Sequence, residues 1–364
     1  MAGAALAPPT MSTGPLQIAI KAEHLTDALR RSGALGDGRV CNVVVESSRA
    51  TLLSNIIRLR LTYDGAAAHA PNSVILKTAL LERTGGLWNT GRQEVAFYSQ
   101  VAAVMSARLV PRCFEAVWDT DTKAWHLLLE DLTDSHVIAT TWPLPPPMEQ
   151  CETIVHARAR FHAEWWDDPR LGASVGAWLD ADAMDRQLKR FAEQFARFTD
   201  RVGDSLPRER RNLYERLLDA APRLLTRYHS HRNVTIVQGD AHVWNCFLPR
   251  DGRGDDVCFF DWDSWRLDPG SDDLAYMMAM HWYPDRRRRM ERPLLDRYHA
   301  VLVAHGVRGY DRRALEDDYR LSVLWQITTP IYQAVNNIPP VIWWNNLERI
   351  LLAVDDLGCL DLLI

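Results

Sequence analysis

The sequence predicts an α+β protein of two lobes: an antiparallel N-lobe with one key helix, and a mainly helical C-lobe with a small β insertion. Three observations support this prediction. The 364 residues suffice for two lobes of roughly 100 to 200 residues, each with its own core. Short β-type runs dominate up to about residue 130, and helical periodicity dominates afterwards. A β-rich patch then interrupts the helices between residues 234 and 260.

The N-lobe, which we place at residues 21–132, begins with a helix and continues mainly as strands. Apolar residues share one face of the expected helix over residues 22–32. Residues 64–65, Asp-Gly, and an Ala-rich loop separate two β-type runs, as in an antiparallel sheet. Expected strands cover residues 40–46, 55–63, 73–78, 113–119 and 125–130, and a second helix covers 93–107. Residues 1–20 are expected to form a mobile tail.

The C-lobe, which we place at residues 133–364, is expected to be largely helical. Four prolines within residues 142–147 indicate a connector that leads into it. Helices are expected over residues 149–166, 182–202 and 209–229. The β insertion has expected strands over residues 234–237, 246–248 and 257–260, and helices resume after it.

Composition and charge exclude several classes of protein. The net charge of −5 does not fit a nucleic-acid binder, which usually carries a broad basic surface. The chain has one short basic run, at residues 286–289, and acids flank it on both sides. We interpret this run as a solvated helix start rather than a phosphate-binding patch. Six scattered cysteines without CxxC or metal-ligand spacing predict neither a disulfide framework nor a zinc site. Residues 1–16 lack a signal-peptide pattern, and no run approaches about 18 apolar residues. We expect a cytoplasmic protein that binds neither nucleic acid nor membrane.

The strongest functional signal is the segment Gln-Gly-Asp-Ala-His-Val-Trp-Asn at residues 238–245, followed sixteen residues later by Asp261-Trp262. Phosphoryl transfer requires a carboxylate that orients the attacking hydroxyl, and oxygen ligands that hold Mg²⁺ on the phosphates. Asp240 can supply the carboxylate, and Asn245 and Asp261 can supply the ligands. Taken singly, these residues could instead cap a turn, form an Asx turn or end a strand. Together they favour the functional interpretation.

This arrangement resembles the aminoglycoside phosphotransferase superfamily, whose loop is commonly written HGDxHxxN with a downstream IDW or IDF. Here the corresponding segments are QGDAHVWN and FFDW, followed by Gly270 and by Asp-Leu-Ala at residues 273–275. The resemblance implies a protein-kinase-like two-lobed fold. It also implies that Asp240 is the catalytic base and that Asn245 and Asp261 are metal ligands.

Four further residues of these motifs have expected structural roles. The resemblance implies that Asp273 braces the catalytic loop rather than touching substrate. Gln238 stands where the superfamily usually has a mostly structural His. His242 fits the motif and is expected to pack within the loop. His162 lies on an expected helix beside aromatic residues, so we interpret it as a packed, hydrogen-bonded histidine rather than a base.

The N-lobe contributes a second set of candidates. Lys77 ends an apolar β-type run, and Glu94 opens the next expected helix seventeen residues later. A kinase uses such a lysine on the α- and β-phosphates and such a glutamate to hold it. Alternatively, Lys77 is solvated and Glu94 simply favours a helix N-terminus. No GxGxxG occurs between residues 45 and 61, and the resemblance implies that Ser54 and Asn55 cover the phosphates.

A hydrophobic run followed by acids at residues 127–132 has the form of the superfamily's hinge. The resemblance implies that backbone groups of Glu130 and Leu132 bind adenine, although an ordinary strand end remains the alternative. Residues 159–166, this hinge and the tail at 343–349 look most like the ecdysteroid-kinase-like branch and its bacterial relatives. The likeness extends from about residue 50 to the C-terminus.

The sequence is less informative about the chemical identity of the acceptor. Aromatic side chains in the C-lobe could hold a flat or ring-shaped apolar molecule, although most are expected in the core: Trp265, Trp282, Trp325, Trp343 and Trp344. Three acids follow Asp261 closely in this chain: Asp263, Asp268 and Asp272. In aminoglycoside kinases, acids at such positions hold cationic sugars. The sequence therefore leaves open an antibiotic, a steroid-like or polyketide-like molecule, or a sugar alcohol.

The leading hypothesis is an ATP- and Mg²⁺-dependent phosphotransferase that moves the γ-phosphate to a hydroxyl of a small molecule. The alternative is a nucleotide-binding pseudokinase that serves as a regulatory or interaction module. The presence of Asp240, Asn245, Asp261 and Lys77 together speaks against that alternative. A protein kinase is disfavoured because no HRD, DFG or APE sequence appears. The sequence indicates neither ATP over GTP nor an oligomeric state.

Overall fold

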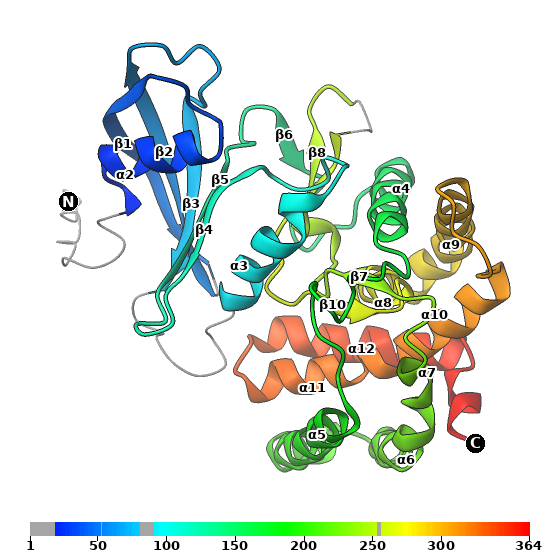
Figure 1. Cartoon of the computed structure of the whole chain (residues 1–364). Coiled ribbons are helices and arrows are strands. Elements are labelled where there is room, and N and C mark those ends of the chain that lie inside the picture. Colours follow the sequence, from blue (N-terminus) through cyan, green and yellow to red (C-terminus); the bar gives the residue numbers. More distant parts are fainter. Residues whose placement is uncertain (1–18, 52, 81–90, 253–255) are drawn as a thin grey trace, which may run out of the picture. The chain divides into compact units, whose positions relative to one another are not determined.

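The computed structural model describes residues 19–51, 53–80, 91–252 and 256–364 (Figure 1). The tail expected over residues 1–20 lies almost entirely outside the described residues. The chain divides into two compact units, the first ending at Ser135 and the second beginning at His136. Sequence reasoning placed this boundary at residue 132. Each unit is described by itself.

The first unit is built on one antiparallel sheet of five strands in the order β1-β2-β3-β5-β4. β1 and β2 form a long hairpin, and β3 joins it to the β4–β5 hairpin. In this register, Lys77 of β3 lies opposite Ile56 of β2 and Leu127 of β5. The strands are β1 (Arg39–Ala50), β2 (Ser54–Asp64), β3 (Ser73–Ala79), β4 (Cys113–Trp118) and β5 (Trp125–Glu130).

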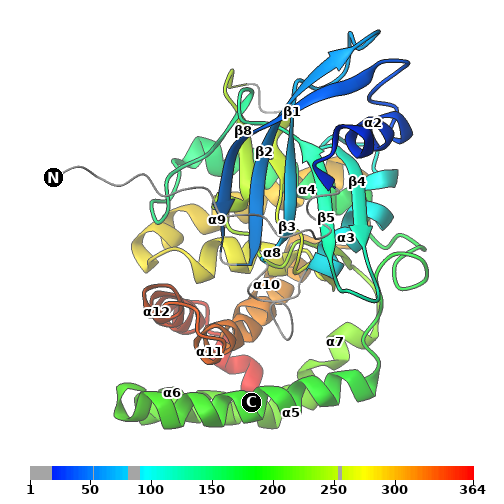
Figure 2. The same cartoon turned by 90° about the vertical axis from the view of Figure 1, so that its left-hand side faces the viewer.

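Two helices cover parts of this sheet. Helix α2 (Ala22–Arg31) places Leu25, Ala28 and Leu29 in the core and packs against β1 and β4 (Figure 2). Helix α3 (Gly91–Gln100) packs against β4 and β5. The helix expected over residues 93–107 is thus too long, because after Gln100 a 3-10 turn (Ala102–Val104) and an extended segment return the chain to β4.

The second unit is mainly helical, as expected. The helix expected over residues 209–229 is divided at Leu225, which caps one helix and precedes the next. The long helices are α4 (Met148–Glu164), α5 (Ala181–Val202), α6 (Arg208–Leu224), α9 (Pro284–Ala304), α10 (Arg312–Gln326) and α12 (Pro340–Asp356), and the shorter ones are α7 (Thr226–His229), α8 (Ser271–Ala275) and α11 (Thr328–Val335).

Two small antiparallel sheets form the β insertion of this unit. One has the order β6-β8-β9, and the other pairs β7 with β10. Their strands are β6 (His136–Ile138), β7 (Thr235–Val237), β8 (Cys246–Pro249), β9 (Cys258–Phe259) and β10 (Arg266–Asp268). The segment 238–245 therefore connects the two small sheets, between β7 and β8. Within this segment, a single 3-10 turn (Val243–Asn245) leads into β8.

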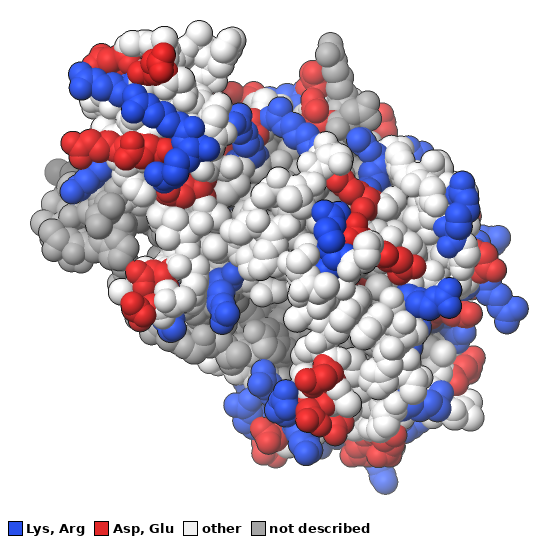
Figure 3. All heavy atoms as spheres, viewed as in Figure 1, with Lys and Arg blue, Asp and Glu red and all other residues white. Residues whose placement is uncertain are grey.

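Two surface properties bear on the expected class of protein. Among the described residues, no helix is long and apolar enough to cross a membrane. On the face shown in Figure 3, Lys and Arg side chains are interspersed with Asp and Glu.

Candidate active site

A tight backbone turn places the segment 238–245 at the end of β7. Gly239 has φ +81°, in the left-handed region that favours glycine. A Cβ atom at this position would lie 2.3 Å from the backbone oxygen of Ser264. Only glycine fits, because the clash would be with backbone and could not be relieved by rotating a side chain.

Asp273, in the short helix α8 of the second unit, holds this turn by hydrogen bonds. The backbone N–H groups of Gln238 and Gly239 donate to its two carboxylate oxygens, each at 3.0 Å. Arg158 also donates to Asp273 at 2.5 Å, and the Nε2 atom of His162 lies 3.2 Å from it. Burial would raise the pKa of Asp273, but the Arg158 charge and these hydrogen bonds hold it well below its ordinary value. Asp273 thus braces the loop, as the family resemblance implied.

His162 is a buried structural histidine in this network. Its Nδ1 atom lies 2.7 Å from the hydroxyl of Tyr298, and its side chain is fully buried. Burial lowers its pKa despite the neighbouring Asp273. The interpretation of His162 as a packed, hydrogen-bonded residue is confirmed.

Gln238 connects the start of the loop to the strand that precedes Asp261. Its side-chain oxygen accepts a hydrogen bond from Arg158 at 2.9 Å, and its nitrogen donates to the backbone oxygen of Phe260 at 2.6 Å. The N–H of Phe260 in turn donates to the backbone oxygen of Asn245 at 3.2 Å. Phe260 is therefore held at both its N–H and its carbonyl group, by the two ends of the same loop.

Asp240 and Asn245 lie together within the loop. The Nδ2 atom of Asn245 donates to the backbone oxygen and to Oδ2 of Asp240, both at 3.0 Å. His242 places Nε2 3.5 Å from the same Oδ2 atom. The pKa of Tyr276 is raised well above its usual value by burial, by the charge of Asp240 and by a hydrogen bond with Asp240. The Tyr276 hydroxyl therefore stays protonated. The Asp240 side chain is 31% exposed, so a substrate can reach it.

Asp261 follows strand β9 in an unusual backbone conformation. Its φ is +66°, which is uncommon for a residue with a side chain and is often found at functional sites. Next to it, Trp262 is fully buried, donates to the backbone oxygen of Phe259 at 3.1 Å, and packs on Phe161 with ring centres 5.0 Å apart. Cys246 pairs with Phe259, and the Phe260 N–H bonds to the Asn245 backbone oxygen, so the backbone segments that carry Asn245 and Asp261 run side by side.

These residues fit a magnesium site in their chemistry. Because the Asn245 nitrogen is engaged by Asp240, its carboxamide oxygen is the atom that can bind a cation. Asp261 contributes a carboxylate. One neutral and one charged oxygen, completed by phosphate oxygens and water, suit Mg²⁺.

In the first unit, the structure brings Lys77 and Glu94 together. The Lys77 Nζ atom lies 2.9 Å and 2.7 Å from the two carboxylate oxygens of Glu94. Both residues are buried, with 8% and 1% of their surface exposed. Because Lys77 is buried, the alternative of a solvated lysine is wrong. Its ion pair with Glu94 offsets the cost of burying the charge.

The other N-lobe candidates lie at strand ends. Ser54 opens β2 and is buried, and its N–H and hydroxyl both bond to the hydroxyl of Thr51, at 3.0 and 3.1 Å. Asn55 accepts a hydrogen bond from Ser48 across the hairpin. Glu130 ends β5 and Leu132 follows it as a buried residue. The structure thus places Ser54 and Asn55 at the start of β2, Glu130 at the end of β5 and Leu132 two residues beyond that end.

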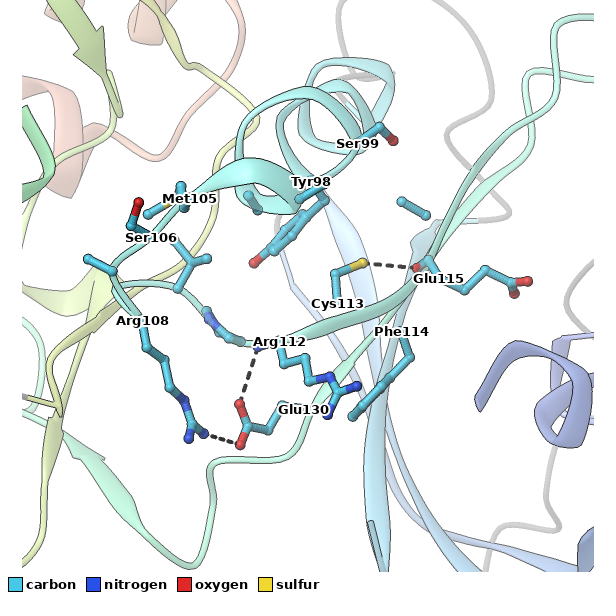
Figure 4. A pocket seen from close by; sticks show the side chains of 16 residues that line it. Tyr98, Ser99, Met105, Ser106, Arg108, Arg112, Cys113, Phe114, Glu115 and Glu130 are labelled. Carbon is cyan, nitrogen blue, oxygen red and sulfur yellow. Dashed lines mark hydrogen bonds and ion pairs between the residues drawn. The ribbon is translucent and has the colours of Figure 1, made fainter. Parts of the chain in front are cut away.

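A pocket of about 590 Å³ lies beside these elements in the first unit (Figure 4). It is lined by residues of α3, of the segment 102–112 that follows this helix and of β4, and by Glu130. The Glu130 carboxylate accepts from the Arg112 N–H at 3.2 Å and forms an ion pair with Arg108. Glu130 thus uses its side chain to join the β4 and β5 strand ends.

Two of the acids considered as ligands for a cationic acceptor are already paired. Arg266 forms ion pairs with Asp268 at 2.8 Å and with Asp272, and Gln326 donates to Asp272 at 3.0 Å. Asp272 is 5% exposed. Of the tryptophans, Trp265, Trp282 and Trp343 are buried, whereas Trp325 and Trp344 are partly exposed.

Sequence reasoning missed the network's central residue, Arg158. It sits one helical turn before His162 on α4, and both side chains reach Asp273. Their spacing of four residues on an otherwise apolar face is the one signal that pointed to them. Tyr276, beside Asp240, follows the Asp-Leu-Ala triplet directly and carried no signal of its own.

Comparison with known proteins agrees with these features. The profile of the ecdysteroid kinase-like family matches residues 174–308, which is less than half of the chain. No curated protein matches the sequence as a relative.

Several solved structures share the fold. A protein assigned to the aminoglycoside phosphotransferases from Ralstonia eutropha JMP134 has a TM-score of 0.59 and 14% identity, over 94% of this chain and 98% of that chain. A choline/ethanolamine kinase family protein from Mesorhizobium loti has a TM-score of 0.51 and 11% identity, over 94% and 92%. The GDP complex of a mutant aminoglycoside 2′-phosphotransferase-IIIa has a TM-score of 0.52 and 10% identity, over 93% and 97%. The predicted protein-kinase-like α+β fold and the resemblance to small-molecule kinases are confirmed.

Proposed function

We propose that this chain is a small-molecule kinase that transfers the γ-phosphate of ATP to a hydroxyl group of its acceptor. The observation that carries this proposal is the braced loop of the second unit. Asp240 and Asn245 are hydrogen-bonded to each other, and Phe260, directly before Asp261, is held by both ends of the same loop. The family match and the shared fold support a phosphotransferase in general.

In this proposal Asp240 orients the acceptor hydroxyl and accepts its proton. Asn245 and the Tyr276 hydroxyl keep the carboxylate in position, since both bond to it. Asn245 and Asp261 hold Mg²⁺. The ion, when bound, neutralises charge on the phosphates. The protein contributes mainly by positioning groups and by stabilising charge.

The residues of the first unit bind the nucleotide in this proposal. Lys77 contacts the α- and β-phosphates, and Glu94 keeps the ammonium group in place. Ser54 and Asn55 lie against the phosphates. Glu130 and Leu132 bind adenine through their backbone groups, which leaves the Glu130 carboxylate in its pairs with Arg108 and Arg112.

Nucleotide binding can be measured without knowing the acceptor. We expect Mg²⁺·ATP to raise the unfolding temperature of the full chain, because a ligand that binds the folded state stabilises it by mass action. Asp261→Ala should lose the Mg²⁺-dependent part of this shift. Asp256→Ala, which removes the same charge at an exposed position of the same hairpin, is the matched control and should keep it. If the wild type shows no shift with Mg²⁺·ATP or Mg²⁺·GTP, the proposal is wrong.

The pseudokinase remains the second candidate, and turnover separates the two. A kinase consumes ATP when a screen of hydroxyl compounds reaches its acceptor, and Asp240→Asn abolishes this consumption. A pseudokinase binds nucleotide and shows no consumption above the Asp240→Asn background with any acceptor. The pairing of Asp268 and Asp272 with Arg266 leads us to place neutral acceptors first in the screen.

A further inference from the structure

Three potential metal ligands meet in the first unit, and none of them is among the residues of the proposed kinase site. The Nε2 atoms of His24 and His126 lie 2.6 and 2.7 Å from the same atom, Oε2 of Glu115. The three residues come from α2, β5 and β4, respectively. Figure 2 shows α2 lying next to β4. Their donor atoms all lie within 4.8 Å of one another.

The orientation of each side chain brings the donor atoms to one point. The two imidazole rings have centres 5.7 Å apart and an angle of 71° between their planes, so both Nε2 atoms can face the same point. Arg31 donates to the other oxygen of Glu115, Oε1, at 2.5 Å. A hydrogen bond of this kind commonly orients a carboxylate that binds a metal with its remaining oxygen.

We propose that His24, Glu115 and His126 bind a transition-metal ion of the Zn²⁺ type, with water in the fourth position. Two histidines and one glutamate are a recurrent ligand set for zinc. Nitrogen and carboxylate ligands also suit Co²⁺ and Ni²⁺, whereas Mg²⁺ and Ca²⁺ prefer oxygen ligands alone. The site lies outside the machinery of the proposed kinase and does not depend on it.

The distances require only a small adjustment. Ligand atoms bound about 2.0 to 2.1 Å from one tetrahedral zinc ion lie about 3.3 Å apart. The present nitrogen–oxygen separations of 2.6 and 2.7 Å must therefore open by roughly 0.6 Å, which rotation of the side chains provides. The side chains of His24, Glu115 and His126 are 25%, 10% and 14% exposed, so an ion and a water molecule can reach them.

The neighbouring pocket is not part of this site. Glu115 also borders that pocket, but in Figure 4 its carboxylate points away from it. The backbone oxygen of Glu115, by contrast, accepts a weak hydrogen bond from the Cys113 thiol at 3.2 Å. The metal ligands therefore lie on the side of β4 that faces α2, not on the pocket side.

A bound ion would tie α2 to the β4–β5 edge of the sheet. Without an ion, the same residues form a hydrogen-bonded group in which Glu115 accepts from two histidines and Arg31. Substitution by glutamine separates the hydrogen-bonded group from the metal site. A glutamine in place of either histidine can still donate to Glu115, but its neutral amide is a poor ligand for Zn²⁺.

The test uses the full chain without an affinity tag, stripped of metal by a chelator. Zn²⁺ is titrated by calorimetry, and Co²⁺ by absorption spectroscopy, which reports the coordination geometry directly. We expect one ion per chain and a tetrahedral Co²⁺ spectrum. His24→Gln and His126→Gln should each weaken binding at least tenfold. His69→Gln, at an exposed histidine of the same unit, is the matched control and should bind like the wild type.

Two results would overturn the proposal. One is the absence of stoichiometric Zn²⁺ binding by the wild type, and the other is equal affinity in the wild type and both ligand variants. Circular dichroism confirms that each variant is folded. The thermal shift with Mg²⁺·ATP is recorded on the same samples, so that loss of the metal site and loss of the proposed kinase site can be told apart.

Discussion

Replacement of Gln238 tests whether the network around Asp273 sets the geometry of the candidate catalytic loop, residues 238–245. Gln238→Leu keeps a similar volume but removes both side-chain hydrogen bonds. The bond to the Phe260 carbonyl is worth about 1 kcal/mol and the bond from the charged Arg158 about 1.5 to 3 kcal/mol. Because Gln238 is fully buried, water cannot replace either partner. We expect the free energy of unfolding to fall by about 2.5 to 4 kcal/mol.

Urea unfolding followed by tryptophan fluorescence measures this change, since most of the tryptophans lie in the second unit. Gln187→Leu, at an exposed position of α5, is the matched control and should change stability by less than about 0.5 kcal/mol. If Gln238→Leu is as stable as this control, the hydrogen bonds of Gln238 do not stabilise the loop, and the reasoning is refuted. The nucleotide thermal shift on the same variant shows whether the Asp261 segment has moved.

Gln238→His introduces the residue that the superfamily usually has at this position. A neutral imidazole can donate to the Phe260 carbonyl and accept from Arg158, so this variant should recover much of the stability that Gln238→Leu loses. The protonated ring has no acceptor and would face Arg158. The folded state therefore lowers the pKa of the introduced ring, and its stability should fall as the pH drops below about 6.5, the usual pKa of histidine. The wild type also loses stability as the pH falls through this range, because burial lowers the pKa of His162 and of His281. The introduced histidine should therefore make the loss steeper than in the wild type.

Three further predictions concern the two units separately. Asp240→Asn should retain Mg²⁺·ATP binding but lose turnover by several orders of magnitude, and full activity would refute its role as base. Glu94→Gln should weaken nucleotide binding about ten- to hundredfold by removing the charged partner of Lys77, as calorimetry would show. Burial would raise the pKa of Asp131, but hydrogen bonds from Ser73, Thr133 and Arg58 lower it to about 2. Above pH about 5, the wild type should therefore be about 2 kcal/mol more stable than Asp131→Asn. This difference should disappear toward pH about 2, where the carboxyl group becomes protonated. Urea unfolding at several pH values measures it.

The candidate catalytic motif could be read from the sequence because its members lie close together in the chain. Asp240 and Asn245 are five residues apart, and Asp261 follows one hairpin later. Such short separations leave few possible arrangements, and the structure joins the Asp240 and Asn245 side chains and bonds Phe260, beside Asp261, to the Asn245 backbone. Lys77 and Glu94 were predictable for a similar reason, because a strand end followed by a helix start is a local pattern.

The residues that hold the motif could not be found in this way. Arg158 lies more than a hundred residues before Asp273, and nothing in either local sequence indicates that they form a buried pair. His24 lies 91 residues before Glu115, so no ligand spacing in the sequence marks the group of His24, Glu115 and His126. The sequence indicated Asp268 and Asp272 as possible acceptor ligands, but in the structure both acids are paired with Arg266.

The sequence by itself determined the α+β class, the five strands of the first unit and most of the helices, but not strands β6 and β10. It also located the candidate catalytic loop. Periodicity, turn residues and short motifs are local properties, and local sequence is sufficient to read them. Only the tertiary structure decided which polar groups are buried together, where a helix ends, and which charges are paired. Those outcomes depend on contacts between distant segments, because a buried charge must find a partner wherever the folded chain supplies one.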